Sequence, residues 1–275
     1  MQVWRERHFH EAEPDQEVLY VRSPAVLSRL ALGFDAILSD IYWTRTIQYY
    51  GSRRLSTAPE KRYDLLHPLL ELTTTLDPYF MIAYRFGAYF LSEVAPGGAG
   101  RPDLAVALLE KGMRYNPDRW EYPHDVAFVY YRLGDYRKAG EWFERAADLP
   151  NAPTWLQPMA AVTLTKGGER QTSRAIFQRL YAAADQKWLK QAAVWRLQQL
   201  DALDAIDELQ RVTAEYQRRH GQPPADWQAV IRSGLIPGMP IDPSGVPYVL
   251  NATWGTVTLS HESPLWPLPV ETAGS

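Results

Sequence analysis

Helical spacing of apolar residues is clearest in residues 134–150, GDYRKAGEWFERAADLP. Small and aromatic residues recur there three or four positions apart, which places them on one face of a helix. Together with the run before Gly134, the set comprises Ala127, Tyr130, Ala139, Phe143 and Ala146. Alanine lets two helices approach closely, and aromatic rings fill the space between them. The pattern therefore predicts a helical hairpin with its turn at Gly134.

Similar apolar runs recur at intervals of about forty residues. Two of the hairpins end at related dipeptides, Asp77-Pro78 and Asn116-Pro117. Pro68 falls inside the second helix predicted for the first unit, which indicates a kink or a late start of that helix. We therefore predict four hairpin units, at residues 40–78, 79–117, 118–150 and 152–185.

Patterned segments also flank the four units. Residues 23–39 form an amphipathic run with a Ser-Pro start, so we predict an extra helix that closes the end of the array. Residues 188–220 are either one long helix or two, ended by Gly221. Prolines and β-branched residues follow, and they predict two short strands, 246–251 and 256–260, around a turn.

The four units resemble tetratricopeptide repeats, and the third unit resembles them most closely. The repeat favours glycine, small and aromatic residues at the positions that Gly134, Ala139 and Phe143 occupy. The resemblance spans residues 40–185 and implies a right-handed superhelix of helical hairpins with a concave groove. We therefore expect a mainly α fold, with a small C-terminal module that consists of a helix and a β-hairpin.

Residues 201–260 resemble the periplasmic part of G-type pseudopilins of type II secretion. In both, a long helix leads to a Pro-rich loop and then to an Asp-Pro-x-Gly-x-Pro-Tyr segment, here Asp242, Pro243, Gly245, Pro247 and Tyr248. The apolar N-terminal helix of a pseudopilin has no counterpart here, so the resemblance implies a borrowed cap or docking module and not a filament subunit. Some pseudopilins bind calcium at a nearby loop, but no ligand set is visible in this sequence.

The predicted organisation has four regions. They are a polar tail at 1–22, a tetratricopeptide-like solenoid with its capping helix at 23–200, the pseudopilin-like module at 201–260 and a Pro-rich tail at 261–275. Trp4 followed by Arg5 and Arg7 is typical of a segment beside a membrane. One hypothesis is an anchor upstream of Met1 and a location at the cell envelope. The alternative is a simple polar tail and a cytoplasmic protein.

Composition and charge exclude several classes of protein. The chain has 275 residues, no cysteine and a net charge of −3. Disulfides and thiolate metal sites are therefore excluded, and a general nucleic-acid binder is not expected. The sequence contains no Walker loop, nucleophile elbow, HExxH motif or Rossmann fingerprint. We predict a protein with no catalytic residues, no cofactor and no metal.

Two groups of polar residues have alternative interpretations. His8 and His10 are spaced like two ligands on one strand, but a metal site needs a third ligand, so a polar tail is favoured. A second group recurs at helical spacing, at Asp201, Asp204, Asp207 and Glu208. These carboxylates either hold a cation or serve acid–base chemistry, or form a solvated stripe near a helix start, which we favour.

The tetratricopeptide resemblance also implies which residues face the concave groove. They are Gln48, Tyr84, Ala88, His124, Phe128, Tyr131, Arg132, Trp155 and Lys166. The set is aromatic with a few basic edges, so it suits an apolar or amphipathic peptide whose aromatic contacts dominate the affinity. Ala88 and Phe128 stand where the chaperone-binding subgroup has Asn, which argues against a chaperone cofactor. For Phe128 and Tyr131, packing between repeats is the alternative.

These observations predict a non-catalytic scaffold that binds a protein or peptide, in a bacterial envelope-associated assembly. One alternative is a structural subunit of a larger complex, held by flat surfaces. Another is an enzyme, which would need a deep pocket lined by perturbed carboxylates. The chain's own tail is a further candidate for the groove, in which case deletion of residues 262–275 would raise the affinity for the partner.

Overall fold

Ten α-helices and one two-stranded sheet make up the part of the chain that the computed structural model describes, residues 32–58 and 60–269. The expected mainly α fold with a small C-terminal sheet is confirmed at this level. The elements fall into two compact units, Met1–Pro153 and Thr154–Ser275.

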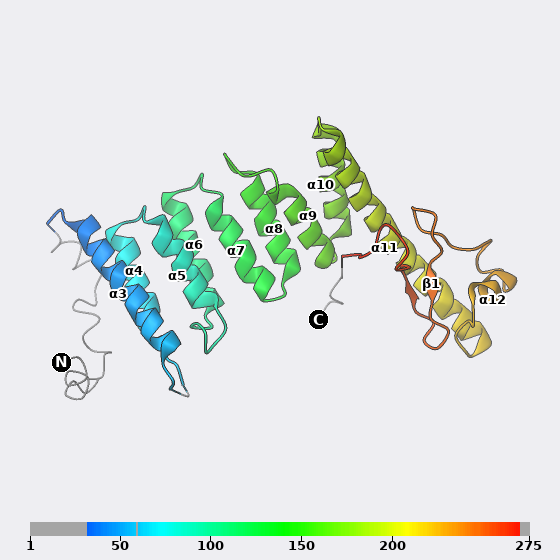
Figure 1. Ribbon diagram of the computed structural model, residues 1–275, viewed down its shortest axis with the longest axis horizontal. Helices are drawn as coiled ribbons and strands as arrows, with labels where there is room; N and C mark the ends of the chain where they lie inside the picture. The colour runs from blue at the N-terminus through cyan, green and yellow to red at the C-terminus, as the bar shows by residue number, and fades with distance from the viewer. Residues whose placement is uncertain (1–31, 59, 270–275) are drawn as a thin grey trace, which may run out of the picture. The chain divides into compact units, whose positions relative to one another are not determined.

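The described residues of the first unit form three helical hairpins in chain order (Figure 1). Their helices are α3 (Asp35–Leu55) with α4 (Leu66–Leu76), α5 (Met81–Ser92) with α6 (Pro102–Tyr115), and α7 (Glu121–Arg132) with α8 (Tyr136–Ala147). Successive hairpins pack through α4 on α5 and α6 on α7. The first helices of the second and third hairpins, α5 and α7, also contact each other. This last contact positions the candidate site.

The hairpin of α7 and α8 has the buried face that its sequence predicts. Ala127, Ala139 and Ala146 are fully buried, Phe143 is almost fully buried, and Tyr130 is half-buried. Because the alanines have no bulk beyond Cβ, the two helices approach closely and the Phe143 ring fills the remaining space.

The turn of this hairpin follows from two residues. Gly134 has a φ of +79°, a left-handed conformation that glycine adopts without steric cost. Asp135 then begins α8 as its N-cap, because its side chain accepts a hydrogen bond from the Lys138 backbone N–H at 3.1 Å.

The first hairpin differs from its sequence prediction at its first helix and agrees with it at its second. The sequence pattern places residues 35–39 in a separate capping helix, but they begin α3, which continues unbroken to Leu55. No glycine or proline lies between Asp35 and Tyr50, so nothing in the chain interrupts the helix there. Pro68 is the third residue of α4, which confirms a late start, since proline is tolerated in the first turn of a helix.

Several sequence expectations concern residues outside the described part of the chain. These are the histidine pair His8 and His10, the basic segment after Trp4, and residues 23–31 of the predicted capping helix. Within residues 32–58 and 60–269, no helix has both the length and the hydropathy that a membrane span requires.

The second unit is built on one long helix. Its elements are α9 (Leu156–Lys166), α10 (Arg170–Ala183), α11 (Lys187–His220), α12 (Trp227–Arg232), β1 (Val249–Leu250) and β2 (Val257–Thr258). The segment that could form one helix or two is thus the single helix α11 (Figure 1). Gly221 ends it with a φ of +76°.

The acidic residues of α11 form ion pairs with α10. Arg170 Nη1 lies 2.9 Å from Asp204 Oδ1 and 2.7 Å from Asp207 Oδ2, and the two terminal nitrogens of Arg174 lie 2.5 Å from Asp201 Oδ1 and 2.6 Å from Asp204 Oδ2. The expectation that this group sits near a helix start is wrong, because α11 begins at Lys187 and the carboxylates lie in its middle. The three aspartates therefore join α10 to α11, whereas Glu208 pairs with Arg211 of its own helix at 2.8 Å.

The C-terminal module packs on the second half of α11. Strands β1 and β2 are antiparallel, with Val249 opposite Thr258. Trp227 of α12 donates its indole N–H to the backbone oxygen of Tyr248 at 2.8 Å, and both side chains are buried. Because α11 contributes Leu200 to the apolar cluster around α9 and α10 and Leu209 to that of the module, the predicted boundary between residues 200 and 201 falls inside a continuous helix.

The C-terminal segment is held on α11 and is not disordered up to residue 269. The buried side-chain amide of Gln199 donates to the backbone oxygens of Leu265 and Pro267 at 2.8 and 2.9 Å. Trp195 donates its indole N–H to the backbone oxygen of Pro264 at 3.0 Å, and the Leu265 side chain is buried. Residues 263–269 therefore pack within the second unit, and residues 270–275 of the predicted tail lie outside the described part of the chain.

Candidate functional site

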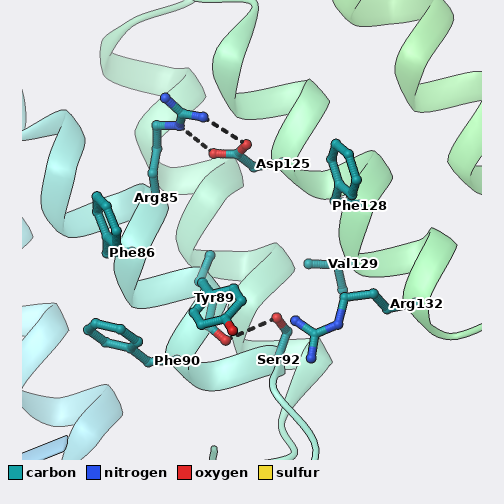
Figure 2. A pocket seen from close by; sticks show the side chains of 10 residues that line it. Arg85, Phe86, Tyr89, Phe90, Ser92, Asp125, Phe128, Val129 and Arg132 are labelled. Carbon is teal, nitrogen blue, oxygen red and sulfur yellow. Dashed lines mark hydrogen bonds and ion pairs between the residues drawn. The ribbon is translucent and has the colours of Figure 1, made fainter. Parts of the chain in front are cut away.

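An open cleft of about 480 Å³ lies between α5 and α7 in the first unit (Figure 2). Its walls combine aromatic rings with a few charged groups at the edges. The lining residues are Arg85, Phe86, Ala88, Tyr89, Phe90, Ser92, Asp125, Phe128, Val129 and Arg132.

Helix α5 exposes large apolar side chains to this cleft because its other side is already occupied. Gly87 sits where an added Cβ would collide with Leu70 of α4 and lie 3.0 Å from Leu108 of α6. This close packing fixes the rotation of α5 about its axis. The opposite side of the helix then presents Phe86 and Tyr89, which are 55% and 49% exposed. Such large aromatic rings in solvent are typical of a surface that binds a partner.

Helix α7 forms the second wall with residues spaced three, four and seven apart, Asp125, Phe128 and Arg132 among them. The Phe128 ring is 40% exposed, and its edge packs on Phe143 of α8 with ring centroids 5.4 Å apart. It also contacts the imidazole of His124 at 4.8 Å. Phe128 is therefore held rigidly while one face stays open to solvent.

A bidentate ion pair joins the two walls at one end of the cleft. Arg85 of α5 donates from Nε and Nη2 to the carboxylate of Asp125 on α7, at 2.5 and 3.1 Å. The hydrogen bond to Asp125 raises the pKa of Arg85 above its ordinary value. Nδ1 of His124 lies 2.9 Å from the same carboxylate. Two parallel charge-assisted hydrogen bonds fix both the distance between the two side chains and the direction in which they meet. This ion pair therefore sets the width of the cleft between α5 and α7.

Arg132 occupies the other end of the cleft. Its guanidinium lies 5.4 Å from the centre of the Tyr89 ring, a cation–π contact. Figure 2 shows Arg132, Tyr89 and Ser92 together at this end, the Arg85–Asp125 pair at the opposite end, and Phe86 and Phe128 on either side. The cleft thus has an aromatic middle and two polar ends.

The structure brings some of the expected groove residues together. Ala88, Phe128 and Arg132 line the cleft, while His124 and Tyr131 contact the Phe128 ring from beside it. Gln48 is exposed on α3 and does not line the cleft. Trp155 and Lys166 belong to the second unit, which begins at Thr154.

Tyr84 does not face solvent, so its assignment to the groove is wrong. The residue is fully buried, its ring packs edge-on against Tyr122 at 5.7 Å, and its hydroxyl donates to the backbone oxygen of Thr74 at 3.3 Å. Burial raises the pKa of the Tyr84 hydroxyl. The physical reason is the rotation of α5 that Gly87 imposes, which turns position 84 toward α4 and α6.

Further residues of the cleft are not among those expected from the sequence. They are Arg85, Phe86, Tyr89, Phe90, Ser92, Asp125 and Val129. One signal was present, because Arg85 and Asp125 are separated by 40 residues, close to the repeat interval, and have opposite charges. Residues at equivalent places in consecutive repeats are neighbours in space, so oppositely charged residues at this offset indicate an ion pair.

The chemistry of the cleft suits binding. Among the described residues, no cluster of three or more histidine, aspartate or glutamate side chains could hold a metal ion. The cleft offers aromatic surface, a closed ion pair and one exposed guanidinium. These groups bind apolar side chains and anions.

No protein-family model matches this chain, and no curated protein matches it either. The resemblances to tetratricopeptide repeats and to pseudopilins therefore stay predictions that rest on the residues quoted above.

Proposed function

We propose that this protein is a non-catalytic tetratricopeptide-type scaffold that binds a peptide segment of a partner protein in the cleft between α5 and α7. The observation that supports this most is the exposure of Phe86, Tyr89 and Phe128 around one cleft. A few buried aromatic contacts provide most of the binding energy in protein interfaces. Three such rings on rigid helices are pre-organised for this role, because helices lose little entropy on binding.

The arrangement of the first unit supports the tetratricopeptide part of the proposal. Its three hairpins follow one another in chain order, and the two walls of the cleft are the first helices of consecutive hairpins. Under this proposal the hairpins form a right-handed superhelix and the cleft is part of its concave side. Residues 201–260 serve as a pseudopilin-like docking module, which is our reason for proposing a bacterial envelope assembly.

A peptide selection tests the binding proposal. A random 12-residue library displayed on phage is selected against the full-length protein, and the enriched peptides are synthesised and titrated by fluorescence anisotropy. The Phe86→Ala, Phe128→Ala double variant should bind these peptides at least about tenfold more weakly than the wild type, since each substitution removes a central aromatic contact. Trp254→Ala is the matched control, because Trp254 is a 74% exposed aromatic residue of the second unit. Equal binding by the double variant and the wild type would overturn the proposal.

A structural subunit held by flat surfaces is the second candidate. Helix α3 exposes Ile37, Ile41 and Ile47, none of which lines the cleft. Under this alternative, Ile37→Glu and Ile41→Glu would release the protein from its native complex, measured by co-purification from the source cells. The Phe86→Ala, Phe128→Ala variant would then stay in the complex. The proposed function predicts instead that the Ile37→Glu and Ile41→Glu variants stay in the complex. It also predicts that the Phe86→Ala, Phe128→Ala variant is released.

A further inference from the structure

Resting on the proposed function, we infer that the cleft selects a peptide segment in which an acidic side chain neighbours a leucine or aromatic anchor. Arg132 pairs with the acidic group, while Phe86 and Phe128 contact the anchor. The inference assigns a charge preference to the site, which the exposed aromatic rings alone do not give.

Arg132 is the group on which the inference rests. In the described part of the chain, the Arg132 guanidinium contacts the Tyr89 ring but has no hydrogen-bond acceptor and no ion-pair partner. The five N–H donors of a guanidinium favour a planar anion such as a carboxylate. Because the Tyr89 ring supports one side of the guanidinium, its remaining donors are pre-organised for such a partner.

The protein's own acidic residues near the cleft are already engaged. Glu93 follows α5 directly, but it accepts hydrogen bonds from the Tyr50 hydroxyl at 2.6 Å and from Arg54 Nη1 at 2.5 Å. Burial alone would raise the pKa of Glu93, but these two hydrogen bonds, together with the positive charges of Arg54 and Arg132, lower it below its ordinary value. Glu93 is therefore a charged group that hydrogen-bonds to α3 and attracts Arg132 without a hydrogen bond to it. The carboxylate that contacts the Arg132 guanidinium directly then comes from the partner.

The other cation of the cleft does not compete for this role. Arg85 uses its Nε and Nη2 donors on Asp125 in a bidentate pair. Breaking that pair would leave a half-buried carboxylate without its partner, at a cost that a single new contact does not offset. The two ends of the cleft therefore differ: Arg132 attracts an anion, and the Arg85–Asp125 end is neutral.

The neighbours of Arg132 define the kind of anion. Nucleic acid requires several cations along a backbone, whereas the cleft contains this one unpaired guanidinium beside exposed aromatic rings, on a chain with a net charge of −3. A carboxylate next to an apolar side chain matches both the Arg132 guanidinium and the exposed aromatic rings. Aspartate or glutamate beside leucine, phenylalanine or tryptophan is the corresponding peptide chemistry.

The first test is the composition of selected peptides. Phage peptides from the random 12-residue library are sorted into those that the Phe86→Ala, Phe128→Ala variant fails to bind and the rest. Within the first group we expect aspartate or glutamate next to an apolar anchor well above its frequency in the unselected library. Absence of this enrichment within the group would overturn the inference and leave the proposed function standing. If the group is empty, the proposed function itself fails.

The second test measures the charge preference directly. One synthetic peptide from that group is compared with a version in which its acidic residue is replaced by the neutral amide. The wild-type protein should prefer the acidic peptide by about tenfold, the size expected of a charge-assisted hydrogen bond. Arg132→Gln should bind both peptides equally, with the affinity of the neutral peptide retained. Arg132→Glu should reverse the preference toward a lysine-containing version.

Arg145→Gln is the matched control for these variants. Arg145 is also an exposed arginine placed over an aromatic ring, 4.7 Å from Trp142 on α8, but it does not line the cleft. The Arg145→Gln variant should therefore retain the full preference for the acidic peptide. The inference is wrong if Arg132→Gln keeps that preference, or if Arg145→Gln loses it to the same extent.

Discussion

At the scale of single residues, small side chains decide which groups the first unit buries and which it exposes. Gly87 lets Leu70 and Leu108 approach the α5 backbone, and Gly112 lets the Tyr122 and Tyr84 rings approach α6, where an added Cβ would lie 2.9 Å and 3.1 Å from them. These contacts fix the rotation of α5. The exposure of Phe86 and Tyr89 therefore follows from the packing on the far side of the same helix.

A glycine-to-alanine pair tests this account of the packing. Gly87→Ala should lower the free energy of unfolding by about 1 to 3 kcal/mol, because the new methyl overpacks against Leu70 and Leu108. Gly51→Ala in α3 is the control, since an added Cβ there meets no atom within 4 Å. It should raise the free energy of unfolding by roughly 0.5 to 1 kcal/mol, the usual gain from alanine in a helix. Urea denaturation measures both values, and equal effects would contradict the account.

A second prediction at this scale concerns the buried Asp242. Burial alone would raise the pKa of its carboxyl, but hydrogen bonds from the side chains of Ser244 and Ser263 and from the Val246 backbone lower it. Because the folded-state pKa is depressed, the carboxylate stabilises the fold above the unfolded-chain pKa of about 3.9. This stabilisation is lost as the pH falls through the lower folded-state pKa.

Asp242→Asn should therefore destabilise the protein by about 1 to 3 kcal/mol at pH 7. The difference from the wild type should shrink as the pH falls below about 4. Thermal unfolding at a series of pH values measures it. Asp226→Asn is the control, because Asp226 caps α12 through a hydrogen bond from Ala229 and asparagine caps equally well. A gap between wild type and Asp242→Asn that stays constant down to low pH would rule out this explanation.

At the scale of elements, α11 organises the second unit. Its first half packs on α9 and α10, and its second half packs on the C-terminal module. Leu268 packs against both apolar clusters, and Gln199 holds the chain just before it. Residues 263–269 therefore form a strap along α11.

Deletion of residues 261–275 tests the role of this strap. The truncated protein should show faster amide hydrogen exchange in α11, because it loses the Gln199 hydrogen bonds and the buried Leu265 side chain. Its affinity for a cleft-binding peptide should not change, since every residue that lines the cleft belongs to the first unit. Higher peptide affinity after truncation would instead support a tail that competes for the cleft.

The sequence predicts the hairpins well and the cleft less well, for a physical reason. Burial of Ala139 and Phe143 follows from spacing within one helix, which a single sequence displays. The Arg85–Asp125 pair and the burial of Tyr84 depend on how α5 is rotated against its neighbours. That rotation results from contacts between segments far apart in the chain, so aligning α5 with a repeat pattern misplaces its faces by about one residue, or about 100°.

At the scale of the whole molecule, the two compact units have different features. The first contains the cleft with its exposed aromatic rings, and the second contains a helix-anchored β-hairpin module. We propose that the first unit binds the partner segment and that the second docks the protein in its assembly. Variants of the second unit such as Asp242→Asn should therefore leave peptide affinity unchanged at temperatures where the protein stays folded.

Photo-crosslinking tests the central claim, the location of the binding site, most directly. A selected peptide with p-benzoylphenylalanine in place of its apolar anchor is bound to the full-length protein and irradiated, and the linked residues are identified by mass spectrometry. We predict crosslinks to residues 85–92 of α5 and 125–132 of α7, and their loss when an excess of the unlabelled peptide competes. Competable crosslinks confined to α3 or to the C-terminal module would contradict the account.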